Sequence, residues 1–400
     1  MRGALAILLL LLLSGLASGE TRRRAVTPPS DQTPASWLAS HAYPLATTEA
    51  VGGLDDLTPL HAIVGSASIV GLADGTHGTH EYFTTKLRII QFLVTQMGFD
   101  TLAIEGTFPQ IERVNAYVQG ESINVRTAIF PRDDEIDYHF WAVEEFIAVA
   151  DWMRLYNLTR GDKPPISIVG IDVWDGVPAS SMVADYLRIV DPSAPKRDQQ
   201  QLLSNEALYV ARSSQRQFDD ALHAATVAEQ SVNALVPAER NHGMAMNTQW
   251  ARDHRSSSGK VVLWGHGEHF GKTIGVENVK SAGMWLDDIF GADYFAIGNA
   301  MWDGIYLGLN GTTASSQEMF IPVVAVNADG YENFFRTAAR PAFVLSLHGA
   351  LHAFLTQPHF LRTAGFSVNN NWNFRIEVRK KYDAIVYVEL TSPTHPLPQP

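Results

Sequence analysis

The sequence of 400 residues contains no cysteine. This absence excludes a disulfide scaffold, a thiolate zinc site, an iron–sulfur cluster and a cysteine nucleophile. A metal ion would have to be held by His, Asp or Glu side chains, and a nucleophile would have to be a hydroxyl group, a carboxylate or water. The chain does contain 14 histidines, so imidazole chemistry is open to it.

Basic residues are also scarce, because 30 Lys and Arg stand against 42 Asp and Glu and leave a formal net charge of −12. No basic stripe is visible along the chain, so nucleic acid is not an expected partner. Hydrophobic residues make up 46% and charged residues 18%, which is typical of a globular protein. The length suits one large domain with a sizeable core, or two ordinary ones.

Long hydrophobic runs are absent except at the amino terminus, where Ala4–Leu13 is continuously apolar. A short basic start precedes this run and small residues at 17–19 follow it, which predicts a secretory signal peptide over residues 1–19. An uncleaved anchor is the alternative, since Arg22–Arg24 come soon after. Cleavage would leave no stable membrane span and predicts a periplasmic or secreted protein. Residues 20–45, rich in Pro, Ser and Thr, are predicted to be a flexible leader.

Beyond residue 45, short apolar runs alternate with longer segments of helical period. Strands are predicted at 68–73, 100–104, 166–169, 261–264, 294–297, 342–345 and 384–390. Helices are predicted at 81–96, near 109–118 and at 141–156. Residues 185–255 contain few strand formers and repeat apolar residues at helical spacing, which predicts an inserted helical hairpin. The predicted class is α/β, a mostly parallel sheet flanked by helices, in one domain over residues 46–395.

Ionisable side chains follow four of the predicted strands. They are Asp74, His77 and His80 after the first, Glu105 after the second, Asp172 after the third, and His266 and His269 after the fourth. Because the carboxyl ends of parallel strands meet at one edge of a sheet, we expect an acid/base site there. His77 or His266 can take a proton from water near neutral pH. Glu105 and Asp74 could orient an imidazole and stabilise its protonated form.

The spacing of short motifs further limits the classes of catalytic site that the chain can form. No Gly-x-Ser-x-Gly motif occurs, so a serine hydrolase is disfavoured. The spacing His-x-x-His occurs twice, and a metal, if present, would have the candidate ligands His77, His80, His266, His269 and Glu105. The His-x-x-His spacing is common and does not by itself indicate a metal site. We therefore expect no cofactor. Trp174, which closely follows Asp172, is expected to form a wall of the substrate site.

An ordered series of sequence blocks resembles the erythromycin esterase family. Gly71–Glu81 resembles the family segment in which a strand leads into Gly-Glu-(Ala/Ser)-Thr-His-Gly. Further matching blocks are Gly98–Glu105, Trp141–Asn157, Gly170–Asp172, Arg240–Trp250 and Val262–His269. The similarity extends from about residue 60 to residue 392.

The resemblance implies hydrolysis of a macrolide lactone by water that a histidine activates, without a covalent acyl-enzyme. By resemblance, His77 is the general base, and Glu105 and His266 complete the site. The residues expected to bind substrate are His269, Asp172, Trp174 and Arg240. Two positions depart from the family pattern, since Asp74 stands where the family has Glu and Gly267 stands where it has Asn.

Taken together, these features predict a secreted esterase that hydrolyses an ester or a macrolide-like lactone by histidine general-base activation of water. The expected partner is therefore a small-molecule ester or lactone. One alternative is a metal-dependent hydrolase that uses the two His-x-x-His pairs. Another is a non-catalytic protein on the same fold that binds a small apolar or haem-like ligand, and the residues at 74 and 267 favour that reading.

Overall fold

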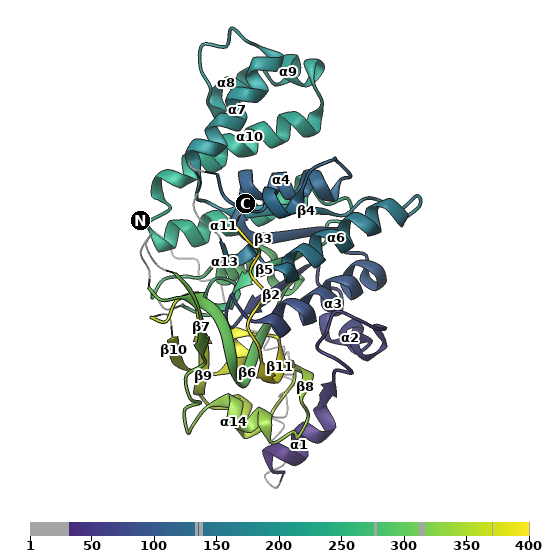
Figure 1. The fold of residues 1–400 in the computed structure, drawn as a ribbon, viewed down its shortest axis with the longest axis vertical. Coiled ribbons are helices and arrows are strands. Elements are labelled where there is room, and N and C mark those ends of the chain that lie inside the picture. The colour runs from purple at the N-terminus through teal and green to yellow at the C-terminus, as the bar shows by residue number, and fades with distance from the viewer. Residues whose placement is uncertain are drawn as a thin grey trace, which may run out of the picture.

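The computed structural model describes residues 32–132, 135, 139–275, 278–311, 317–369 and 371–399. The predicted signal peptide, residues 1–19, lies outside the described residues. Within the described part of the chain, no helix is both long and apolar enough to cross a membrane. The fold is a mixed, mostly parallel sheet with helices on both faces, which confirms the predicted class (Figure 1).

The central sheet has the strand order β1-β8-β11-β6-β2-β5-β3-β4, and β7 pairs with β6. The strands are β1 (Ala42–Pro44), β2 (Ile69–Asp74), β3 (Thr101–Thr107), β4 (Ser167–Asp172), β5 (Val261–His266), β6 (Tyr294–Leu309), β7 (Glu318–Pro322), β8 (Ala342–Ser346) and β11 (Ala384–Thr391). The six neighbouring strands from β11 to β4 are parallel, whereas β8 and β1 form an antiparallel edge. A separate antiparallel hairpin joins β9 (His359–Ala364) and β10 (Asn371–Ile376).

Helices cover both faces of the sheet, and this explains why β2, β4 and β5 are buried over their full length. The helices on one face are α2 (Leu60–Val64), α3 (His80–Met97) and α6 (Glu144–Thr159), and on the other α11 (Pro237–His254) and α13 (Ala282–Phe290). Further α-helices are α4 (Phe108–Val118), α5 (Val125–Ala128), α12 (Gly267–Phe270), α14 (Tyr331–Arg336), α15 (Ala353–Thr356) and α16 (Val378–Lys381). Strands with both faces covered have continuous apolar runs, which is the pattern seen in the sequence.

Helix α3 forms within one residue of its predicted bounds at each end. It stops at Gly98, whose φ of 75° is the left-handed conformation that glycine adopts at least cost. At the other end it begins directly after residues 75–79, which we call the His77 loop. The position of α3 therefore fixes one end of that loop.

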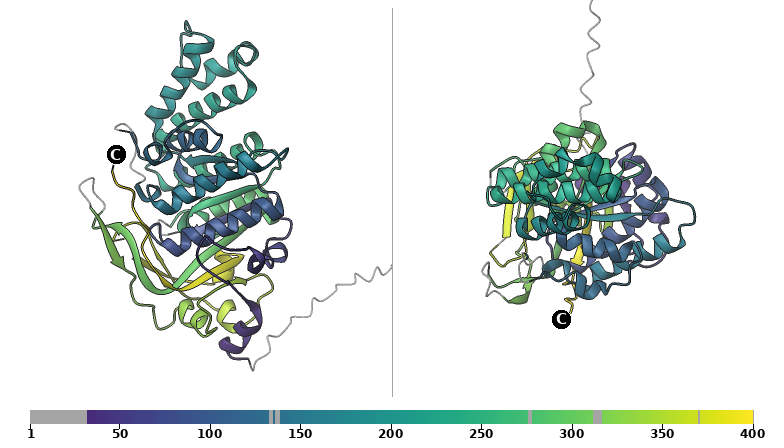
Figure 2. Two further views of the ribbon diagram at one scale, coloured as in Figure 1. Left: turned by 45° about the vertical axis from the view of Figure 1, so that its right-hand side comes forward. Right: turned by 90° about the horizontal axis from the view of Figure 1, so that it is seen from above.

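Four helices form a projection that stands clear of the sheet at one end of the molecule (Figures 1 and 2). They are α7 (Gly176–Val190), α8 (Gln199–Ser204), α9 (Glu206–Arg212) and α10 (Gln215–Gln230). The predicted insertion at residues 185–255 is helical, but its bounds differ. The projection begins earlier, and α11 packs instead against β4 and α13 in the body of the fold. Helical periodicity alone does not reveal which helix packs on the sheet.

The prediction of a flexible leader over residues 20–45 is wrong for its second half. Residues Pro34–His41 form helix α1, and β1 then pairs with β8 at the edge of the sheet. Trp37 and Leu38 are buried in the main core. Fully burying one large apolar side chain contributes about 1.5–3 kcal/mol, so this pair is enough to anchor a segment whose composition otherwise suits a linker.

Strand β6 is much longer than the predicted 294–297. Its second half is partly exposed and pairs with β7, so it lacks the continuous apolar run that identifies a buried strand. This extension reaches the His77 loop, where the N–H of Leu307 donates to the carbonyl of Gly78 at 2.8 Å.

Residues 392–397, the segment that follows β11, lie against the start of α3. The N–H of His80 donates to the carbonyl of Ser392 at 2.9 Å, and the N–H of Thr394 donates to the carbonyl of Gly78 at 3.1 Å. The His77 loop is therefore held from both sides by segments that are more than two hundred residues away in the sequence.

Candidate active site

Four adjacent parallel strands bring polar side chains to one edge of the sheet. β2, β5, β3 and β4 are neighbours in that order, and their carboxyl ends point the same way. The predicted residues at this edge are His77 in the loop after β2, Glu105 in β3, Asp172 at the end of β4, His266 at the end of β5 and His269 in α12. The first four of these are at most 5% exposed. The structure thus brings together side chains that the sequence placed at separate strand ends.

Arg240, from α11, connects three of these groups. Its guanidinium donates to Asp172 through Nε at 3.0 Å and Nη2 at 2.5 Å, and Nη2 also lies 3.1 Å from Glu105 Oε1. Nη1 lies 3.1 Å from His269 Nε2. The other ring nitrogen of His269 is 2.8 Å from Asn241 Oδ1, so His269 donates from Nδ1 and accepts at Nε2. A two-bond contact between Arg240 and Asp172 gives the network a fixed geometry.

Burial controls the charge of Glu105. Desolvation raises the pKa of Glu105 to about 7, and the negative charge of Asp172 acts in the same direction. The Arg240 charge opposes this shift, as does the His266 N–H that donates to Glu105 Oε2 at 2.7 Å. Glu105 can therefore gain or lose a proton near neutral pH.

The pH dependence of the stability of the Glu105→Gln variant tests the raised pKa of Glu105. A raised pKa in the folded state means that the contribution of Glu105 to stability is present below pH 4.5 and is lost as the pH rises towards 7. Glutamine cannot ionise, so the free energy of unfolding of the variant should rise relative to that of the wild type between pH 5 and pH 8. Denaturant unfolding at the two pH values measures this difference. If the free energy of unfolding of the variant instead fell relative to that of the wild type as the pH rises, ionised Glu105 would be stabilised by its partners.

His266 is held as a neutral imidazole. Its Nε2 donates to the carbonyl of Ala364 at 3.1 Å, and its Nδ1 accepts from the N–H of Glu268 at 3.3 Å, an N-cap of α12. Burial lowers the pKa of His266 to about 4. Burial and the nearby Arg240 charge also lower the pKa of His269. Both imidazoles are therefore neutral groups at neutral pH.

The ring of His77 lies between two other rings. It stacks on Phe140 with centroids 4.3 Å apart, and its centroid is 5.0 Å from that of His266. These contacts, together with the backbone bonds to the His77 loop, fix where the imidazole lies. His77 therefore lies at the edge of the sheet where the sequence predicted an acid/base site, next to His266.

Asp74 does not orient an imidazole, contrary to one role that the sequence suggested. Its carboxylate forms a buried ion pair with Lys86 and accepts from Trp264 Nε1 at 2.9 Å. Burial raises the pKa of Asp74 and lowers that of Lys86 to about 8, and the attraction between the two charges opposes both shifts. The ion pair of Asp74 with Lys86 thus links the end of β2 to α3. Asp74, whose side chain is shorter than the Glu of the family pattern, therefore has a defined partner in Lys86.

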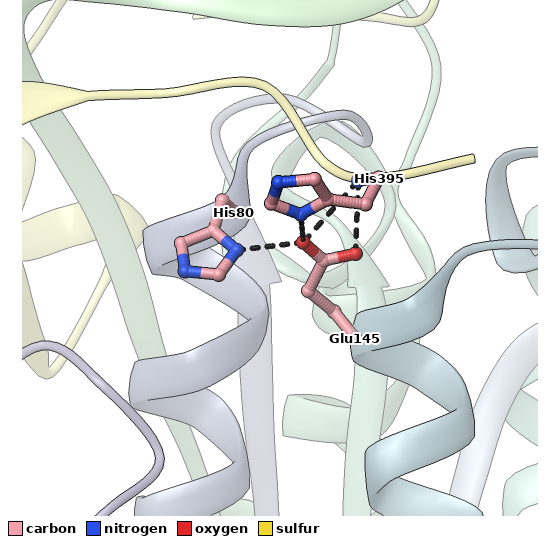
Figure 3. Close-up of side chains that lie close together, drawn as sticks. All are labelled: His80, Glu145 and His395. Carbon is pink, nitrogen blue, oxygen red and sulfur yellow. Dashed lines mark hydrogen bonds and ion pairs between the residues drawn. The ribbon is translucent and has the colours of Figure 1, made fainter.

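The candidate metal set of five residues is not assembled. His80 points instead to Glu145, with Nδ1 2.6 Å from Oε1 (Figure 3). Its Nε2 is 3.2 Å from Glu49 Oε2. The hydrogen bond that His80 donates to the Glu145 carboxylate raises the pKa of His80 to about 9. Within the described part of the chain, the group of side chains close enough to share a metal ion is His80, Glu145 and His395.

Trp174 lies beside the network, with the guanidinium of Arg240 5.9 Å from its ring centroid. It is partly exposed, which suits the predicted position in a substrate wall. Phe140, Asn241 and Ala364 were missed by the sequence reasoning. Asn241 directly follows Arg240 in α11 and is buried beside His269, so its position next to a predicted site residue was the one signal that could have found it. Nothing local in the sequence links the other two to His77 or His266.

Gly78 is the residue that allows the His77 loop to pass close to β6. A Cβ at this position would overlap the backbone of Leu307. We expect Gly78→Ala to cost about 1–3 kcal/mol of unfolding free energy and to lower turnover by displacing His77. Gly53→Ala is the matched control, because its Cβ would meet nothing closer than 3.9 Å. Thermal unfolding and turnover of the two variants make the comparison, and a fully active Gly78→Ala protein would contradict it.

The presence of glycine at position 267 is also explained by steric constraints. A Cβ there would overlap the hydroxyl of Tyr382 and come within 2.9 Å of the backbone carbonyl of Asp74. The space that an asparagine side chain would enter is therefore filled by Tyr382. This departure from the family pattern is explained by packing and does not require the loss of a reactive group.

Comparison with known proteins identifies the family. The family model for erythromycin esterase matches residues 94–211 and 197–391. The chain belongs to the erythromycin esterase family. Erythromycin esterase type II from Escherichia coli is 27% identical over 165 residues, which cover 40% of this chain and 37% of that relative. The "Putative hydrolase YbfO" of Bacillus subtilis (strain 168) is 21% identical over 90% of this chain and 91% of its own length.

Solved structures show the same fold. A Bacillus cereus protein superposes with a TM-score of 0.77 at 23% identity and covers 92% of this chain and 98% of its own. A histidine-to-asparagine mutant of the erythromycin esterase EreC, in its open conformation, superposes with a TM-score of 0.65 at 16% identity and covers 85% of this chain and 94% of its own. The erythromycin esterase family and the hydrolase relatives together support a hydrolase function for this chain.

Proposed function

We propose that the protein hydrolyses a carboxylic ester or a lactone, with His77 as the general base that activates water. The observation that carries this proposal is the buried network in which Arg240 joins Glu105, Asp172 and His269, next to the packed rings of His77 and His266. Clusters of buried titratable groups with shifted pKa values cost stability and are typical of active sites. Membership of the erythromycin esterase family supports the reaction class.

The proposed reaction begins when His77 takes a proton from water as the water oxygen attacks the carbonyl carbon. The tetrahedral intermediate then collapses, the bond from carbon to the leaving oxygen breaks, and protonated His77 returns its proton to that oxygen. No covalent acyl-enzyme forms, in keeping with a chain that lacks both cysteine and a nucleophile-elbow serine.

Each neighbouring group has a defined part in this scheme. His266 stays neutral and packs against His77, so it positions the base without competing for the proton. Glu105 can hold or release a proton near neutral pH, because burial raises its pKa to about 7. Arg240 keeps the carboxylates in place, and Trp174 is proposed to form a wall against the substrate.

A substrate panel tests this proposal. Macrolide lactones, simple lactones and simple esters are offered to the purified chain, and acid release is followed at constant pH. Hydrolysis of at least one class, abolished by His77→Asn, is the expected result, and hydrolysis of macrolides would identify a macrolide lactone as a substrate. Ligand binding without turnover across the panel would instead favour a binding protein on this fold.

We also propose that the protein is exported, with residues 1–19 as its signal. The pattern of a basic start, an apolar run and small residues supports this proposal. Amino-terminal sequencing of the protein from the periplasm of a bacterial host should begin at about Glu20. Recovery of the uncleaved chain in the membrane fraction would favour an anchor.

A further inference from the structure

Three side chains from distant parts of the chain meet beside the His77 loop (Figure 3). His80 lies at the first residue of α3, Glu145 in the first turn of α6, and His395 in the 392–397 segment. Both imidazoles face the same carboxylate oxygen, since His80 Nδ1 and His395 Nδ1 each lie 2.6 Å from Glu145 Oε1. One atom from each residue lies within 4.8 Å of the other two.

The donor set is chemically suited to a transition metal. Two imidazole nitrogens and one carboxylate oxygen are ligands that zinc accepts at about 2.0–2.2 Å, and zinc sites commonly combine three protein ligands with one water. In such a site, neighbouring ligand atoms stand roughly 3.3 Å apart, so the two contacts of 2.6 Å would need to open by less than one ångström.

The surroundings also match those of a metal site. The second ring nitrogen of His80 is 3.2 Å from Glu49 Oε2, an arrangement in which a carboxylate orients a metal-bound histidine from behind. Glu145 is buried and also accepts from the backbone N–H of His395, at 3.1 Å to Oε2 and 3.2 Å to Oε1, so its carboxylate is fixed. The side chain of His395 is 68% exposed, which leaves the site open to an ion from solvent.

We propose that His80, Glu145 and His395 form a binding site for a divalent transition metal, with Zn²⁺ as the best fit, outside the candidate active site. Such an ion ties the 392–397 segment to α3 and α6. Since this segment donates to Gly78 in the His77 loop, metal binding also steadies that loop. The ion does not act on the substrate, and the proposal does not depend on the identity of the reaction.

Zinc titration of the metal-stripped full chain tests the site directly. Calorimetry should show one equivalent of Zn²⁺ bound, and zinc should raise the unfolding temperature. His395→Ala removes an exposed ligand and should lower the affinity at least tenfold, while Glu49→Gln should lower it by about 10–100-fold. His348→Ala is the matched control, because His348 is an exposed histidine that faces one carboxylate, Asp383, at 2.7 Å, and it should bind zinc as the wild type does.

His395→Gln provides a second ligand variant with a polar side chain of similar length, in case alanine disturbs the segment. Circular dichroism of each variant checks that the fold is kept. Zinc affinity that is equal in the wild type, His395→Ala and His348→Ala would overturn the proposal, as would the absence of binding in the wild type. Neither measurement uses catalysis, so a failed substrate panel and a failed metal site give different results.

Discussion

Replacing His77 with asparagine should lower kcat by about 10²- to 10⁴-fold, the range that a positioned general base contributes. Asparagine keeps a polar side chain of similar size next to Phe140 and His266, but it cannot take a proton from water. Because the substrate groups away from the reacting carbonyl are still bound, KM should change little. Steady-state kinetics on the best substrate from the ester and lactone panel measure both constants.

His61→Asn is a suitable control for that experiment, since His61 is an exposed histidine in α2 whose ring faces Phe92. It carries the same chemical change and should keep the kinetics of the wild type. The unfolding temperature of His77→Asn should stay close to that of the wild type. Unchanged turnover in His77→Asn would remove His77 from the mechanism and direct attention to Glu105 as the base.

The second large effect is expected from Arg240→Ala, and it concerns stability as well as activity. Asp172 is fully buried and Glu105 nearly so, and both are held by the Arg240 guanidinium. Removing one partner of a buried ion pair leaves an uncompensated charge, which costs about 3–5 kcal/mol of unfolding free energy. Denaturant unfolding at neutral pH measures this loss, and turnover should fall with it because His269 and Glu105 lose their common partner.

Arg240→Lys separates charge from geometry. Lysine keeps the positive charge but cannot make the parallel bonds to both oxygens of Asp172. The variant should recover part of the stability lost in Arg240→Ala and less of the turnover. Equal stability of the alanine variant and the wild type would mean that water enters the network and replaces the guanidinium.

Much of the body of the fold could be predicted, because its signals are local. The runs at β2, β4 and β5 are continuous and apolar, as strands covered on both faces must be. Gly98 marks the end of α3, since few other residues adopt a positive φ cheaply. The rule that sites form at the carboxyl ends of parallel strands was enough to select His77, Glu105, Asp172 and His266.

The partners of those residues could not be predicted, because they are set by register and by loop paths. His266 donates to Ala364, nearly a hundred positions along the chain, through a hairpin that the sequence did not reveal. His80 has the same spacing to His77 as His269 has to His266, yet it turns towards Glu145. Spacing along the chain does not determine the direction in which a side chain at a helix start points.

The central place of β2 has a consequence for the order in which the molecule forms. β2 is the earliest of the six parallel strands in the chain, but its neighbours in the sheet are β5, which begins at residue 261, and β6, which begins at residue 294. Pairing between segments so far apart is slow, because the entropy of closing the intervening chain is lost before the contact is gained. During synthesis, an apolar strand therefore waits unpaired until the second half of the chain has emerged. Recovery of soluble protein should accordingly be sensitive to growth temperature and to chaperones, even where the finished fold is stable.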